Sequence, residues 1–161
     1  MSARKALSAI AISASILLAT TGCSFTPSQH IASMQDYAPS DGAQVVVGHL
    51  KIRNAFILTN GTTTALFGSV VNSGNDDIDA TIQYTSKDGV KSNISFPVFA
   101  GEKIDIGYNG TEPVKLDIDA TEGTNVQIWL LDNVNAGQSV NVPVLSGAKA
   151  EYAELFNLLG K

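Results

Sequence analysis

Cysteine is almost absent from this sequence of 161 residues, since Cys23 is the only one. A single thiol cannot form an intrachain disulfide, so the fold must depend on apolar burial and backbone hydrogen bonds. Histidine and methionine are also scarce, and His30, His49, Met1 and Met34 are the complete set. Nucleophilic catalysis needs a base beside the nucleophile, and with two histidines the chain has few residues that could serve as this base. We therefore expect that the protein is not an enzyme.

Basic residues are few as well. Lys and Arg number 10 against 15 Asp and Glu, which gives a net charge of -5. Removal of the signal segment described below takes Arg4 and Lys5 and no acidic residue, so the net charge becomes -7. Binding of nucleic acid depends on neutralising phosphates, so we expect no nucleic-acid partner. Anionic lipid head groups are disfavoured for the same reason.

Motifs that hold phosphate or calcium are missing. Gly107 and Gly110 are isolated turn residues and form no phosphate-binding loop. Asp76, Asp77 and Asp79 lie on a hydrophilic turn, without the spaced oxygen ligands and the following glycine of a calcium loop. We expect these carboxylates to be solvated and the protein to have no cofactor.

The strongest positive signal is the start of the chain, residues 1–22. Two basic residues and a run of small and apolar side chains from Ala6 to Ala19 precede Cys23. The run is too short to span a bilayer and predicts a secretory signal peptide. Cys23 then becomes the first residue of a bacterial lipoprotein, and its thiol carries a diacylglyceryl group. Thr20 stands where such signals usually have Leu, and a freely secreted protein is the alternative.

Residues 23–42 are rich in Ser, Thr and Pro and show no period of 2 or 3.6. This composition predicts a flexible tether between the lipid on Cys23 and the folded domain. We expect the domain to stand on the extracytoplasmic face of the cell membrane. His30 and Met34 are four residues apart and are weak candidates for a metal site.

Residues 43–146 consist of short β-type runs separated by turn residues. Val45 to Leu58 is apolar and β-branched, with a kink near Lys51 to Asn54, and Ala80 to Tyr84 alternates cleanly between apolar and polar side chains. The pairs Asn60-Gly61 and Asp88-Gly89 predict tight turns. Roughly seven to nine strands at this spacing predict an all-β fold, an antiparallel immunoglobulin-like sandwich. A β-barrel is the alternative.

Two residues of this β region could carry function. His49 lies in the first predicted strand, beside Gly48 and Leu50, and we expect it to be a structural or surface histidine; it is the third weak metal candidate. Trp129 is the only tryptophan of the chain, and we expect it in the core.

The tail, residues 147–161, breaks the β pattern. Tyr152, Leu155, Phe156 and Leu159 fall on one side of a helix. A helix this short is marginal alone, so its apolar side must lie against something. Either it packs on the sandwich and covers an open end or edge, or it contacts the groove of a partner protein.

Several short stretches carry a resemblance to a known family. They are Ile52–Ala55, Leu66–Gly74 and Asn141–Leu145, with Tyr152 soon after. The run from Lys51 to Leu145 resembles actinobacterial lipoproteins of the LpqE type, distant relatives of the periplasmic copper chaperones called PCu(A)C. The resemblance implies an immunoglobulin-like or cupredoxin-like sandwich on the outer face of an actinobacterial membrane.

The resemblance does not bring a metal site with it. The copper chaperones bind Cu(I) through a His and two or more Met on spaced strands, whereas here Met34 precedes the domain. Our first hypothesis is therefore a non-catalytic, membrane-tethered module that binds a protein of the cell envelope. Alternatives are copper binding through His30, Met34 and His49, binding of an envelope lipid or glycan, and an enzyme of unrecognised type.

Overall fold

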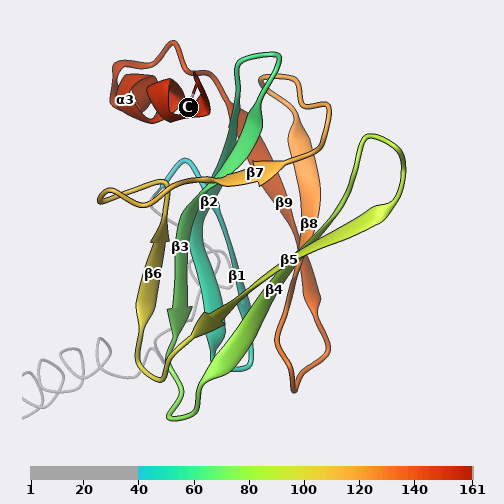
Figure 1. Ribbon diagram of the computed structural model, residues 1–161, viewed down its shortest axis with the longest axis vertical. Helices are drawn as coiled ribbons and strands as arrows, with labels where there is room; N and C mark the ends of the chain where they lie inside the picture. Colours follow the sequence, from blue (N-terminus) through green and yellow to red (C-terminus); the bar gives the residue numbers. More distant parts are fainter. Residues whose placement is uncertain (1–39, 161) are drawn as a thin grey trace, which may run out of the picture. The chain divides into compact units, whose positions relative to one another are not determined.

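The computed structural model describes residues 40–160, which are mostly β-strand (Figure 1). Its strands are β1 (Ala43–Val47), β2 (Leu50–Thr59), β3 (Thr64–Asn72), β4 (Ile78–Thr85), β5 (Lys91–Val98), β6 (Lys103–Ile106), β7 (Val114–Leu116), β8 (Asn125–Leu131) and β9 (Gln138–Leu145). Three short helical segments follow, η2 (Ala150–Tyr152), α3 (Ala153–Phe156) and η3 (Asn157–Gly160). The expected signal peptide, Cys23, His30 and Met34 lie outside the described residues. Within residues 40–160, no helix has the length and apolarity needed to span a membrane.

All nine of these strands belong to one curled sheet, in the order β5-β4-β8-β9-β2-β3-β6, with β1 beside β2 and β7 beside β3. The sheet curls into two layers, one formed by β5, β4 and β8 and the other by β1, β2, β3, β6 and β7. Strand β9 joins them, because it is antiparallel to β8 and its end at Val144 and Leu145 runs parallel to Ile57 and Leu58 of β2. Every other pairing is antiparallel. The edge strands β5 and β6 do not pair with each other in the described part of the chain, so no closed barrel forms. The expected all-β sandwich is confirmed, with one parallel pair in addition.

The larger apolar core lies between the two layers of the sheet. Alternate side chains of the strands point into it, among them Ile82 and Tyr84 of β4 and Ile128 and Leu130 of β8. The expected alternation of β4 is confirmed, because Thr81 and Gln83 lie between buried neighbours and are only half-buried. The predicted reversals at Asn60-Gly61 and Asp88-Gly89 are present, but as longer loops, residues 60–63 and 86–90, in which Gly61 and Gly89 have φ angles of 83° and 77°.

Strand β2 contributes to both faces of its sheet because of a bulge. Asn54 has a φ of 50°, and the register with β3 shifts between Arg53 and Phe56, close to the predicted kink. An extra residue in a strand moves every following side chain to the opposite face. Even-numbered residues such as Ile52 therefore enter the main core before the bulge, and odd-numbered ones such as Ile57 enter it afterwards. Phe56 is thereby turned to the outer face.

The C-terminal segment covers this outer face of β2 and β3. A second apolar cluster forms there from Phe56, Leu58, Ala65, Phe67 and Leu159, with Tyr152, Leu155 and Phe156 packed against it. The helical tail therefore lies on a face of the sheet, rather than over the open end or edge expected from the sequence. The physical reason is the bulge in β2, since it leaves an apolar outer surface that would otherwise face water.

The start of the described chain also contacts the domain. Asp41 and Gly42 belong to the segment that the sequence assigns to the tether. The carboxylate of Asp41 accepts a hydrogen bond from Tyr152, and the buried Gly42 donates its N–H to Oδ1 of Asn54 at 3.2 Å. These two residues are thus held by the folded domain.

Candidate functional site

Three loops gather at one end of the sandwich and enclose a hollow of about 440 Å³. They are the β1–β2 turn, the loop between β3 and β4, and the loop between β8 and β9. Its lining includes His49, Asp76, Asp77, Asp132 and Val134. Loops held by a rigid scaffold are where β-sandwich proteins commonly place their binding residues.

His49 lies in the tight turn between β1 and β2, not within a strand as the sequence suggested. The strand prediction is wrong because Gly48 has a φ of 56°, which reverses the chain between the buried Val47 and Leu50. The imidazole is exposed, as expected of a surface histidine. It stands on the rim of the hollow.

The loop between β3 and β4 is fixed by a buried asparagine. Asn72 is 0% exposed, and its Nδ2 donates to the carbonyl oxygens of Asp76 at 2.7 Å and Val98 at 3.1 Å. Its Oδ1 accepts the N–H of Gly74 at 2.9 Å. A buried polar side chain with its hydrogen bonds satisfied holds the surrounding backbone in one arrangement. This side of the hollow is therefore pre-formed.

The β1–β2 turn is tied to the same loop. The carbonyl oxygen of His49 accepts the N–H of Ser73 at 2.9 Å and its hydroxyl at 3.0 Å. These two hydrogen bonds connect the β1–β2 turn directly to the loop between β3 and β4.

The third loop is closed by Asp132. One carboxylate oxygen accepts the N–H groups of Val134, at 2.9 Å, and Asn135, and the other accepts Nδ2 of Asn135 at 2.7 Å. Partial burial opposes ionisation of Asp132, but the hydrogen bonds from Asn135 and Val134 outweigh it and lower the pKa of this carboxyl. Asp132 therefore stays charged, and Val134 is held outward, 82% exposed.

The hollow is acidic. Asp76, Asp77 and Asp132 lie on it, whereas none of the residues that line it is Lys or Arg. Asp76 and Asp77 are exposed in this loop, as predicted, whereas Asp79, which was predicted on the same turn, is an exposed residue of β4. Asp77 also contacts the loop between β5 and β6, since its Oδ1 accepts the N–H of Ala100 at 2.9 Å.

A copper site does not fit these residues. His49 is the only histidine in the described part of the chain, and residues 40–160 contain neither Met nor Cys. Cu(I) prefers thioether, thiolate and imidazole ligands. Across residues 40–160, moreover, no three His, Cys, Asp or Glu side chains are placed to hold a metal ion together. His49 could supply at most one ligand.

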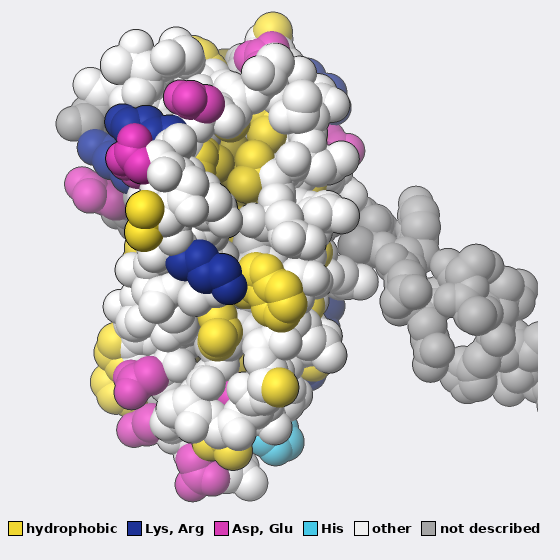
Figure 2. Space-filling view, turned by 90° about the vertical axis from the view of Figure 1, so that its right-hand side faces the viewer, with side chains coloured by type: hydrophobic (Ala, Val, Ile, Leu, Met, Phe, Trp, Pro, Cys, Tyr) yellow, Lys and Arg dark blue, Asp and Glu magenta, His cyan; other side chains and the backbone are white. Residues whose placement is uncertain are grey.

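Trp129 lies on the outer face of the β4–β8 layer, 39% exposed, and its prediction as a core residue is wrong. Ile128 and Leu130 take the inward positions of β8 and leave the odd-numbered position to solvent. The alternation of Val126, Ile128 and Leu130 was the signal that could have shown this. Figure 2 views this side of the domain, where hydrophobic side chains gather in the middle beside a basic one and acidic side chains lie toward the margins.

The predicted apolar stripe of the tail packs against the domain's own sheet. Phe56 stacks on Phe67 with ring centroids 5.5 Å apart, and the ring of Tyr152 lies 5.1 Å from that of Phe56. Leu159 is 3% exposed in the same cluster, and Leu155 and Phe156 are half-buried. The structure thus supports packing on the sandwich, and contact of these residues with a partner stays a prediction.

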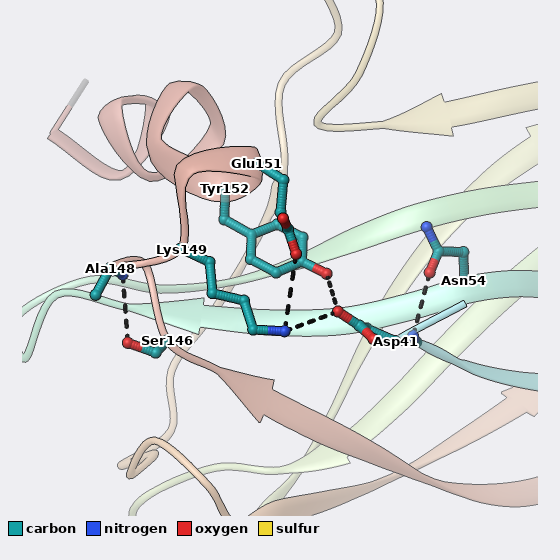
Figure 3. A network of polar contacts seen from close by, with 8 residues as sticks. Asp41, Asn54, Ser146, Ala148, Lys149, Glu151 and Tyr152 are labelled. Atoms are coloured by element: carbon teal, nitrogen blue, oxygen red, sulfur yellow. Dashed lines mark hydrogen bonds and ion pairs between the residues drawn. The ribbon is translucent and has the colours of Figure 1, made fainter. Parts of the chain in front are cut away.

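Polar contacts fasten the tail at its start (Figure 3). Asp41 accepts hydrogen bonds from the Tyr152 hydroxyl at 2.7 Å and from Nζ of Lys149 at 3.1 Å, and Lys149 also lies 3.7 Å from Glu151. Burial, together with the bond to Asp41, raises the pKa of Tyr152. The hydrogen bonds from Tyr152 and Lys149 lower the pKa of Asp41. At neutral pH, Asp41 is therefore ionised and Tyr152 keeps its proton.

The fold and the loop-end hollow define a small all-β sandwich domain with a helical segment on one outer face. Among solved structures, the apo PmoF2 PCuAC domain has this fold: the match has a TM-score of 0.50 and 15% identity over 66% of this chain and 97% of that domain. The copper-bound PCuAC domain from PmoF2 matches with a TM-score of 0.49 and 16% identity, over 64% of this chain and 97% of that one. No protein-family model and no curated protein matches the sequence. The resemblance to PCuAC domains is confirmed at the level of the fold.

Proposed function

We propose that this chain is an extracytoplasmic lipoprotein, anchored to the membrane through Cys23, whose sandwich is a non-catalytic module that binds a protein of the cell envelope. The observation that supports this function is the pre-formed hollow at the loop end. Its walls are held by the hydrogen bonds of Asn72 and Asp132, so a partner would meet an ordered surface and little binding energy would be lost in ordering it.

The chemistry of the hollow favours a basic segment of the partner. Asp76 and Asp132 supply negative charge, and the exposed Val134 supplies an apolar contact at the rim. A Lys or Arg side chain combines an apolar stem with a charged head and matches both features. Complementary charge would also steer the encounter of the two proteins.

Site-specific crosslinking in intact cells tests this function. A photoreactive amino acid at Asn133, exposed beside the hollow, should capture a defined protein. The same amino acid at Thr62, in the turn at the other end of β2, is the matched control and should not capture it. Identical adducts from both positions, or none from Asn133, would contradict the proposal.

Charge reversal provides the second measurement. Asp76→Lys should weaken capture of that protein by about tenfold or more, since like charges would then meet. Glu122→Lys, an exposed position before the start of β8 and so far from the hollow, should leave capture unchanged. Equal effects of the two substitutions would indicate non-specific attraction to the acidic domain.

Copper binding is the second candidate, and it is favoured by the fold shared with the apo PmoF2 PCuAC domain. In this chain it would require His30 and Met34 to join His49, because the described residues supply only the imidazole. Titration of the mature chain with Cu(I) against a competing chelator tests it. A tight one-to-one complex that is lost in both Met34→Ala and His49→Ala would establish this function over the first.

A further inference from the structure

The outer face of the β4–β8 layer carries a row of side chains centred on Trp129. The register places Gln83 of β4 on one side of Trp129 and Ser139 of β9 on the other, and Asn93 of β5 lies beyond Gln83. The row therefore consists of two amides, an indole and a hydroxyl, and it crosses four neighbouring strands. All four side chains lie on the side of the sheet that faces away from the core.

Hydrogen bonds within this face orient its polar groups. Nε2 of Gln83 donates to Oδ1 of Asn93 at 2.9 Å, and the hydroxyls of Thr81 and Ser95 in the adjacent row lie 2.7 Å apart. An amide has two acceptor sites and two donor hydrogens. The bond between Gln83 and Asn93 thus leaves the carbonyl of the first and the NH₂ group of the second available to a ligand.

A hollow of about 200 Å³ lies beside Trp129 on the same face. Gln83, Thr85 and Gln127 contribute to its wall, and Lys91 is the only charged residue that lines it. No carboxylate lies on this hollow, although the domain as a whole is acidic. Tyr84 and Val126 complete the lining, so the surface beside the indole is concave, partly polar and partly apolar, and carries one positive charge.

We propose that this face binds a glycan, with a pyranose ring stacked on Trp129. The C–H groups on one side of a pyranose carry a small positive charge, and the face of an indole carries a negative one. Sugar hydroxyls both donate and accept hydrogen bonds, as do the amides of Gln83, Asn93 and Gln127. A flat aromatic ring surrounded by such groups matches a sugar chain laid across the strands. The site is separate from the loop-end hollow and would give the domain a second ligand.

The composition of the face distinguishes a glycan from a protein partner. The buried centres of protein interfaces are rich in apolar side chains and contain several aromatic residues. Here a single indole, with the half-buried Leu131 next to it on the same face, is surrounded by amides and hydroxyls. The amides would lose hydrogen bonds to water against an apolar partner and keep equivalent ones against a sugar.

Fluorescence tests the proposal directly, because Trp129 is the only tryptophan of the chain. The mature chain is titrated with chitohexaose and mannohexaose, and its retention on insoluble peptidoglycan is measured in parallel. We expect a saturable change in tryptophan emission with at least one soluble sugar, and retention on the polymer that the same free sugar releases. No change in emission at millimolar sugar, together with no retention on peptidoglycan, would overturn the proposal.

Variants then locate the site. Trp129→Ala should weaken retention by about tenfold or more, and Gln83→Ala by a smaller factor. Phe99→Ala removes an aromatic ring that is 57% exposed in the turn after β5 and should have no effect. Amide NMR spectra show whether the Trp129 variant is folded; should it not be, Gln83→Ala and Asn93→Ala serve as the test. Glycan binding here would be contradicted if Trp129→Ala, Gln83→Ala and Asn93→Ala were all retained on peptidoglycan as well as wild type. It would also be contradicted if these substitutions abolished capture of a protein partner and left binding of sugar unchanged.

Discussion

The phenol of Tyr152 donates a 2.7 Å hydrogen bond to the carboxylate of Asp41, which lies 111 residues earlier in the chain. The bond joins the segment before β1 to the segment after β9, so it fastens both ends of the described domain over the outer face of β2. Lys149 reinforces it from the same side. The tail is consequently a structural part of the domain.

Loss of this bond should loosen the tail. Tyr152→Phe keeps the ring that lies 5.1 Å from Phe56 and removes only the hydroxyl, so we expect a small decrease in Tm. Tyr152→Ala removes the ring as well and should lower Tm further. Thermal unfolding followed by circular dichroism measures both. If Tyr152→Phe and Tyr152→Ala melt alike, the ring contributes nothing.

The same bond predicts a pH dependence. The pKa of Tyr152 is raised in the folded state by burial and by Asp41, so above pH 10 the folded chain keeps a proton that the unfolded chain loses. The free energy of unfolding should therefore fall as the pH rises beyond about 10. Urea unfolding of wild type and Tyr152→Phe between pH 8 and 11 measures the difference. An advantage of wild type that does not shrink over this interval would contradict the assignment.

Gly147 should be intolerant of a side chain. A Cβ built on it would overlap Cδ2 of Phe156, so the ring would have to shift within the second apolar cluster. We expect Gly147→Ala to lower the free energy of unfolding by about 1–3 kcal/mol, as overpacking does. Gly160→Ala is the control, because a Cβ there meets nothing within 4 Å. If Gly147→Ala and Gly160→Ala were equally stable, the Phe156 ring could not lie against Gly147.

Asp105 should stabilise the domain except at low pH. Lys103 at 2.8 Å, Ser69 at 2.7 Å and Asn109 at 2.7 Å hold the pKa of this carboxyl at about 2. Its stabilising effect is therefore complete above an unfolded-state pKa near 3.8 and is lost as the pH falls toward 2. The difference in unfolding free energy between wild type and Asp105→Asn should shrink over that window. A difference in unfolding free energy that stays constant from pH 7 to pH 2 would show that ionised Asp105 does not stabilise the domain in this way.

The lipid anchor is tested by Cys23→Ala. The variant should leave the membrane fraction while its domain keeps the wild-type Tm, because the substitution removes the predicted lipid attachment site and none of the contacts within residues 40–160. Cell fractionation and thermal unfolding measure the two outcomes. A mature variant that stays with the membrane would require another anchor.

Much of the fold could be predicted from the sequence because it depends on local patterns. The alternation in β4 and the turn pairs Asn60-Gly61 and Asp88-Gly89 specify strands and reversals through interactions between near neighbours. The position of His49 was missed because a left-handed Gly48 converts an apparent strand into a hairpin turn. Trp129 was missed because large aromatic residues are usually buried, although the alternation of β8 points it outward.

The candidate sites depend on contacts that no local pattern contains. The loop-end hollow needs His49, Asp76 and Asp132 to meet from three loops, and the row at Trp129 needs the register of β5, β4, β8 and β9. Hydrophobic patterning does not encode which strands become neighbours, since each apolar face can be buried against several others. The sequence alone determined the β class and the amphipathic tail, which follow from composition and spacing, and the signal peptide before Cys23 stays a prediction from the same patterns. Only the tertiary structure decided that the bulge at Asn54 turns Phe56 outward and that the tail covers it, because burial of that ring depends on residues about a hundred positions away.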